Sequence, residues 1–358
     1  MRKGLWVNMN SSKAVNPYLS MIKSIGLSVL LLAVVTVLPA CGSSKTEGEG
    51  SQVSSVAESA KASDGEGNAA AVSDSSAEDQ AQVYPLTVTD ELGHEVTIPS
   101  KPVRIFAPMM EDSLLVLGVK PVVQWSNGVE PQLYLQDQLG DVPQISFAGG
   151  MPSPEAIMAL EPDLIILNNQ AYAEKGGYEQ LSKIAPTYVF ENAATDLSSS
   201  IQILGELLDK SGEAEEALKE YNDKVASTRE KLSTLVEGKK AAIIRFNAKG
   251  MFFMNNQYYS GYVMNHELGF EQSTLVKDGA FQVSLEILPE LDANYIFLAN
   301  DGNQGDAYLK ELKKSSLWQT VPAVKAGHVY ETNSDYWLSG GLIAQGKVID
   351  DVVGFLAP

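Results

Sequence analysis

The sequence predicts an α/β fold of two Rossmann-like lobes with mainly parallel sheets, joined by one long helix. Three observations lead to this prediction. Short apolar runs alternate with helical patterns, one apolar stripe at helical spacing lies midway along them, and a segment before the stripe resembles a segment after it. Strands that alternate with helices favour parallel sheets covered by helices. A repeated unit on each side of a long helix then gives one lobe per copy.

The predicted strands follow an opening hairpin. Leu86–Asp90 and His94–Pro99 alternate in polarity around a turn, which is typical of two antiparallel strands. The later candidate strands are short apolar runs: Val103–Ala107, Pro121–Gln124, Leu164–Leu167, Thr187–Phe190, Ala241–Phe246, Met251–Met254 and Tyr295–Ala299.

The long helix is predicted from apolar side chains at steps of three and four residues, namely Leu218, Tyr221, Val225, Thr228, Leu232 and Leu235. A shorter helix, Leu197–Leu208, precedes it. The stripe also fits an ordinary core helix, but its position between two strand-rich halves favours a linking spine.

The internal repeat aligns Ser153–Leu167 with Ser284–Leu298 at a constant offset and without a gap. In each copy a serine-capped helix is expected to lead into a buried strand. The alignment places Glu155 opposite Glu286.

The first 83 residues differ from the rest of the chain. Basic residues precede an apolar run, Ile25–Leu38, which is too short to span a membrane but suits a signal peptide. Cys41 follows a small residue and resembles the lipidated cysteine of a bacterial lipoprotein, although a stray cysteine beside an ordinary cleavage site is the alternative. The predicted organisation is a signal peptide (1–40), a lipidated, disordered acidic tether (41–83), an N-terminal lobe (84–195), linking helices (196–238) and a C-terminal lobe (239–358).

Composition excludes several classes of protein. The formal net charge of −19 argues against nucleic-acid binding, which needs a basic surface. One cysteine rules out a disulfide framework, and with three scattered histidines it argues against a structural zinc site. No nucleophile-elbow, phosphate-loop or zinc-protease motif is present, so we expect no enzyme, no metal centre and no cofactor.

Several sequence segments, in this order along the chain, resemble those of one protein family. They are the hairpin running into Lys101–Ile105, then Glu111–Pro121, Leu160–Ile166 and Trp318–Tyr330. Together they resemble the substrate-binding lipoproteins of ABC importers for iron siderophores, haem and cobalamin. Tyr134–Asp137 and Tyr178–Tyr188 are most similar to the subgroup for ferric citrate or citrate-hydroxamate siderophores. The resemblance implies a monomer anchored through Cys41 to the outer face of the cytoplasmic membrane, in a Gram-positive bacterium.

The resemblance also implies roles for individual residues. One glutamate on each lobe, Glu155 and Glu286, would dock onto the permease, which works with its ATPase; two solvated helix-start glutamates are the alternative. A Trp after the last helix–strand unit, Trp337, would pack on the ligand, unless it only closes the core.

The ligand cleft is expected beyond the carboxyl ends of the strands. Candidate cleft residues, besides Trp337, are Met109, Trp125, Asn127, Asn168, Arg245, Tyr258, Tyr259 and Asn300. Arg245 follows a buried run and needs an anionic partner, either a ferric chelate or a neighbouring Asp or Glu.

Other ligands and roles stay open. Only three arginines follow the signal peptide, which is few for a tricatecholate receptor. A haem receptor is suggested by Met151, but Asn300 and Asp301 stand where a histidine would be expected. A cobalamin receptor and a surface sensor without transport are the remaining alternatives.

Overall fold

The computed structural model describes residues 82–257, 259–276 and 281–357. Cys41 and the predicted signal peptide lie outside these ranges, as does all of the predicted tether except its last two residues. The domain boundaries proposed above therefore stay predictions. Among the described residues, no helix has the length and apolar character needed to cross a membrane.

The hairpin is confirmed. Strands β1 (Leu86–Thr89) and β2 (Glu95–Ile98) pair antiparallel, with Leu86 opposite Ile98. Val96 and Ile98 are buried in the main core, while the alternate residues of β2 face solvent. The turn is fixed by Asp90, whose carboxylate accepts hydrogen bonds from the backbone N–H groups of Leu92 and His94.

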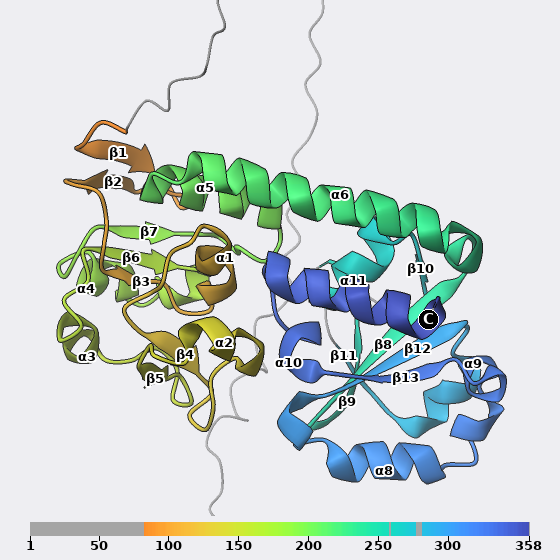
Figure 1. The fold of residues 1–358 in the computed structure, drawn as a ribbon. Coiled ribbons are helices and arrows are strands. Elements are labelled where there is room, and N and C mark those ends of the chain that lie inside the picture. Colours follow the sequence, from red (N-terminus) through yellow and green to blue (C-terminus); the bar gives the residue numbers. More distant parts are fainter. Residues whose placement is uncertain (1–81, 258, 277–280, 358) are drawn as a thin grey trace, which may run out of the picture. The chain divides into compact units, whose positions relative to one another are not determined.

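The N-terminal lobe has two small parallel sheets (Figure 1). One contains β3 (Ile105–Phe106), β6 (Leu164–Leu167) and β7 (Thr187–Val189), in that order. The other pairs β4 (Gln124–Ser126) with β5 (Gln144–Ser146). The short helices of this lobe are α1 (Glu111–Val116), η1 (Leu133–Leu135), α2 (Gln136–Leu139), α3 (Pro154–Met158), η2 (Gln170–Tyr172) and α4 (Gly177–Leu181), where η marks a turn other than an α-helix.

The C-terminal lobe has one sheet of order β11-β9-β8-β12-β13, with β10 also pairing with β8. Its strands are β8 (Lys240–Asn247), β9 (Gly250–Met254), β10 (Glu271–Gln272), β11 (Phe281–Val283), β12 (Tyr295–Asn300) and β13 (Val329–Thr332). Its helices and turns are α7 (Tyr259–Tyr262), η3 (Val263–Glu267), η4 (Leu285–Glu290), η5 (Asp301–Asn303), α8 (Asp306–Lys314), η6 (Trp318–Thr320), α9 (Pro322–Ala326), α10 (Ser334–Trp337) and α11 (Leu342–Leu356).

The linking helices are confirmed as elements. Helix α5 (Leu197–Leu208) has the predicted bounds, and α6 (Ser211–Val236) contains the whole predicted stripe. Helix α6 contacts α1 of the first lobe and η3 of the second, and α11 lies alongside it (Figure 1). One core cluster continues beneath these helices, with Ile166 of the first lobe and Phe297 of the second among its members. The apolar stripe is therefore buried against both lobes.

Most strand predictions hold, with one correction. The strand predicted at Pro121–Gln124 is wrong, because pairing begins only at Gln124 and continues to Ser126. The preceding residues still follow the sheet edge, since Val122 N–H donates to the Ile105 carbonyl. Strands β5, β10, β11 and β13 have no long apolar run and were not predicted.

The repeat corresponds to helix–strand units in both lobes. Helix α3 leads into β6, and the 3₁₀ turn η4 leads into β12. The predicted serine cap forms in the first copy, where Ser153 Oγ accepts from Ala156 N–H at 3.3 Å. In the second copy Ser284 makes no such cap hydrogen bond, and the turn is of the 3₁₀ type.

A buried carboxylate joins α1 to the start of α11. Asp112, 2% exposed, accepts hydrogen bonds from the N–H groups of Ile343 at 3.0 Å and Ala344 at 2.8 Å, and from the Tyr134 hydroxyl at 3.0 Å. It thus acts as the N-cap that α11 lacks in its own sequence. Gly341 is required beside it, because its φ is 112° and a Cβ would lie 2.1 Å from the Asp112 carboxyl carbon.

We predict that Asp112→Asn lowers the free energy of unfolding by about 2–4 kcal/mol, because an amide N–H₂ would face the N–H donors of α11. Chemical denaturation near neutral pH measures this loss. The matched control is Asp223→Asn, which breaks an exposed pair with Lys219 on α6 and should cost far less, because solvent screens this pair. Equal losses for the two variants would contradict the structural role of Asp112.

Candidate functional site

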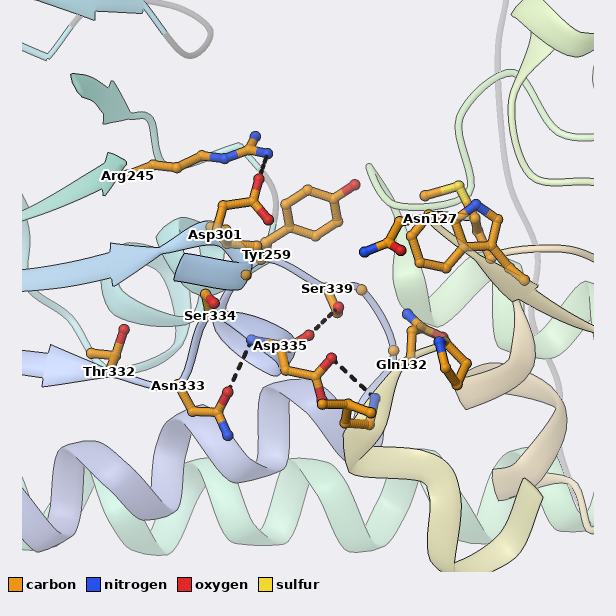
Figure 2. Close-up of a pocket in the computed structure, with 18 of the residues that line it drawn as sticks. Asn127, Gln132, Arg245, Tyr259, Asp301, Thr332, Asn333, Ser334, Asp335 and Ser339 are labelled. Carbon is orange, nitrogen blue, oxygen red and sulfur yellow. Dashed lines mark hydrogen bonds and ion pairs between the residues drawn. The ribbon is translucent and has the colours of Figure 1, made fainter. Parts of the chain in front are cut away.

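A cavity of about 810 Å³ lies between the lobes. Its wall includes residues at or just after the carboxyl ends of β3, β4 and β6 on one side and of β8, β12 and β13 on the other. This is the edge at which parallel sheets bind ligands. Figure 2 shows the two sides facing each other, with Arg245, Asp301 and Tyr259 opposite Asn127.

The first lobe contributes Met109, Trp125, Asn127 and Asn168, as the sequence predicted. Trp125 is fixed through its backbone N–H, which donates to Glu111 Oε1 at 2.6 Å. Asn127 Oδ1 accepts from two backbone N–H groups of its own turn. Asn168 Oδ1 is buried and has no hydrogen-bond partner among the described residues.

The second lobe contributes Arg245, Tyr259 and Asn300. Arg245 forms an ion pair with Asp301, so the neighbouring-acid alternative is the one observed here. The Arg245 Nε–H is buried and makes no hydrogen bond within the described part of the chain. The amide of Asn300 bonds to Asp306 and to Gly305 N–H, and thus shapes the start of α8.

Two of the predicted cavity residues have strained backbones. Met109 has φ 63° and Tyr259 has φ 56°, a region that residues other than glycine rarely adopt. Such conformations persist only where the surroundings enforce them, and they concentrate at binding sites.

The expectation that Trp337 packs on the ligand is not met in this structure. Trp337 is fully buried, its indole N–H donates to Asp351 at 2.8 Å, and its ring stacks on Phe297. It does not line the cavity, so it closes the core, which was the alternative. Met151, considered as a haem ligand, packs in the first lobe and is also absent from the wall. Tyr258 lies outside the described residues.

The structure adds cavity residues that the sequence did not indicate. Glu130 and Gln132 lie on the loop after β4, and Asn333, Ser334 and Asp335 follow β13. Asp335 accepts from the N–H groups of Leu133 and Tyr134, which ties α10 to η1. Because β13 was not predicted, the position of these residues at a strand end was not visible in the sequence.

Glu155 and Glu286 lie away from the cavity, each exposed in the first turn of the short helix of its lobe. Local hydrogen bonds lower the pKa of both carboxyls. For Glu155 the main cause is a hydrogen bond with its own backbone, followed by one with the Ser153 side chain. For Glu286 the main cause is a hydrogen bond with the Ser284 side chain, followed by one with its own backbone. Both side chains are therefore charged at neutral pH. No cluster of three or more His, Cys, Asp or Glu side chains suited to a metal ion occurs among the described residues.

Two adjacent buried acids support the wall. Burial raises the pKa of Glu111 to about 7 and that of Asp112 to about 6, although backbone N–H donors oppose the shift. Glu111 Oε2 has no partner among the described residues, which fits a carboxyl that readily holds a proton.

Comparison with known proteins points to one family. The periplasmic binding protein family matches residues 111–336. The chain is 29% identical over 284 residues to the probable siderophore-binding lipoprotein YfiY of Bacillus subtilis, which covers 74% of this chain and 86% of that protein. It is 28% identical over 272 residues to the iron(3+)-hydroxamate-binding protein YxeB of the same organism, covering 73% and 82%.

A solved structure is similar over the same region. Staphylococcus aureus SirA complexed with staphyloferrin B matches with a TM-score of 0.66 and 28% identity, covering 76% of this chain and 98% of that one.

We predict that the free energy of unfolding rises as the pH falls from ~8 to ~5. Burial holds the folded-state pKa of Glu111 above its usual value, so protonation of Glu111 favours the folded protein over the unfolded chain, and this contribution is lost as the pH rises through about 7. Its size is on the order of a few kcal/mol. Denaturation at stepped pH measures it, and Glu111→Gln should flatten the slope. A wild-type profile without slope in this window would contradict the prediction.

Proposed function

This chain belongs to the periplasmic binding protein family, and from that premise we propose that it is the extracytoplasmic receptor of an ABC importer for a ferric siderophore. It would capture the complex between its lobes and deliver it to the permease. The iron is cargo that arrives in its chelate, and the protein catalyses no reaction.

The single observation that carries this proposal is the cavity between the lobes at the strand ends. Its volume of about 810 Å³ lies within the range of ligand pockets, and it combines aromatic, thioether and amide side chains on its two walls. The named relatives YfiY and YxeB, and SirA with its bound siderophore, support a ligand of the same class. Receptors for haem or cobalamin, and a surface sensor, find no comparable support.

Delivery is proposed to use Glu155 and Glu286. Each is exposed and charged, and each lies in the equivalent unit of its own lobe. Two carboxylates on separate lobes give a partner with complementary cations a defined orientation. Lipid on Cys41 would hold the protein at the outer face of the cytoplasmic membrane, with residues 42–83 as a tether and a monomer as the working unit.

We predict saturable quenching of tryptophan fluorescence when the folded chain is titrated with a ferric siderophore, since Trp125 lines the cavity. Trp125→Phe should lose most of the signal. Trp318→Phe is the matched control, because Trp318 is buried in a separate cluster of the second lobe and does not line the cavity. Absence of quenching and of binding by equilibrium dialysis, for every ferric complex tried, would contradict the proposed function.

We also predict that Glu155→Lys and Glu286→Lys abolish cellular uptake of ⁵⁵Fe-siderophore while leaving its affinity unchanged. The reason is that both carboxylates lie outside the cavity but would pair with cations of the permease. Glu179→Lys and Glu311→Lys place the same charge change on other exposed positions, one in each lobe, and should transport normally. Normal uptake by both docking variants would rule out this role.

A further inference from the structure

The residues that line the cavity include few positively charged side chains. Among its described residues Arg245 is the only Lys or Arg, whereas four carboxylates are present: Glu130, Asp301, Glu331 and Asp335. Arg245 is already paired with Asp301, and Glu331 at 2.7 Å with Lys313, which is not a lining residue. Each ion pair is neutral as a unit, so no free cation faces the cavity from the described wall.

Two carboxylates remain in excess. The Asp335 carboxylate accepts hydrogen bonds from the backbone N–H groups of Leu133 and Tyr134 and forms no ion pair with a described Lys or Arg. The Glu130 carboxylate accepts no hydrogen bond and forms no ion pair within the described part of the chain, although the Glu130 backbone carbonyl accepts from Asn127 N–H. Both residues line the same cavity. Its described wall therefore carries two carboxylates that no cationic side chain of the wall neutralises.

The rest of the polar wall is uncharged. It consists of amides, hydroxyls and backbone groups, with side chains such as Asn127, Gln132 and Asn333 labelled in Figure 2. Amide and hydroxyl groups of this kind can pair with a ligand that carries carbonyl acceptors and N–H donors.

From this charge distribution we infer that the cavity selects a ferric trihydroxamate that is neutral or cationic, and disfavours ferric citrate and other polyanionic chelates. Three hydroxamates cancel the charge of Fe(III), and their carbonyl oxygens and linking amides supply acceptors and N–H donors. A polyanion would meet Glu130 and Asp335 without a free cation to compensate, and excess like charge in a partly desolvated cavity costs affinity. The inference rests on the proposed function and narrows it from the citrate or hydroxamate class to the hydroxamate class.

The test uses the ferric complexes of desferrioxamine B, its N-acetyl derivative and its N-succinyl derivative. These ligands share one iron-coordination sphere but end in an ammonium, a neutral amide and a carboxylate. Ferric citrate is the polyanionic probe. Affinities of the full chain, measured by fluorescence quenching and dialysis at low and high salt, should fall roughly two- to fivefold for each added negative charge, and the differences should shrink with salt.

Two variants localise the effect. Glu130→Gln should reduce the preference for the cationic over the anionic derivative by about two- to fivefold. Asp301→Asn releases Arg245 and should raise the affinity for the N-succinyl complex and for ferric citrate. Glu216→Gln, an exposed residue of α6 far in sequence from any lining residue, is the matched control and should leave the ratio unchanged. Thermal unfolding of each variant establishes that it is folded.

The possible outcomes distinguish the charge selection by the cavity from the proposed function as a siderophore receptor. Equal or tighter binding of ferric citrate or the N-succinyl complex at low salt overturns the charge selection and leaves the siderophore receptor standing. A preference that Glu130→Gln and Asp301→Asn do not change also overturns it. Failure of folded protein to bind any of the four ferric complexes removes the proposed function itself, and the inference with it.

Discussion

The arrangement of the lobes depends on one buried carboxylate. Asp112 belongs to α1 of the first lobe, yet its hydrogen-bond partners are the first N–H groups of α11, the last helix of the chain. Without it these donors would be buried without partners, which is costly in a low-dielectric interior. The loop that precedes α11 supplies Ser339, Gly340 and Gly341 to the cavity wall, so the same contact that caps the helix also positions part of the site.

This contact is electrostatically unfavourable in one respect, because it buries a carboxylate next to a second acidic side chain. Asp112 lies beside the equally buried Glu111, whose carboxylate holds the backbone of Trp125 at the opposite part of the wall. Neighbouring residues of one short helix thus fix two separate segments of the cavity. Together with the core shared beneath α5, α6 and α11, these contacts connect the two lobes.

The fold was largely predictable because its signals are local. The stripe on α6, the buried run of β6 and the hairpin each follow from periodicity over a few residues. Strand β5, with the sequence Gln-Ile-Ser, carries no such pattern and owes its existence to pairing with β4. Residues that follow a strand can be identified as candidates for the cavity wall only if the strand itself is predicted. Because β13 was not predicted, Asn333, Ser334 and Asp335 were not recognised as residues at a strand end.

The site was predictable only in part because its charges depend on partners distant in sequence. The position of Arg245 after an apolar run predicts that its guanidinium needs an anionic partner. The sequence does not identify which anion this is. Asp301 provides the anion, and it lies just after β12, the strand that pairs with β8 in the sheet. Trp337 illustrates the opposite case, in which a side chain with the right position in the sequence turns inward to Asp351 and Phe297.

The central claim is that a preformed cavity, held by the Asp112 contact, receives the ligand with little movement of the lobes. Amide hydrogen exchange at Ile343 and Ala344 tests it most directly, because these N–H groups donate to Asp112. The account predicts slow exchange at both amides without ligand, at rates similar to those with a bound ferric trihydroxamate. Fast exchange in the free protein, with protection appearing only on binding, would show that the lobes separate when empty and would contradict it.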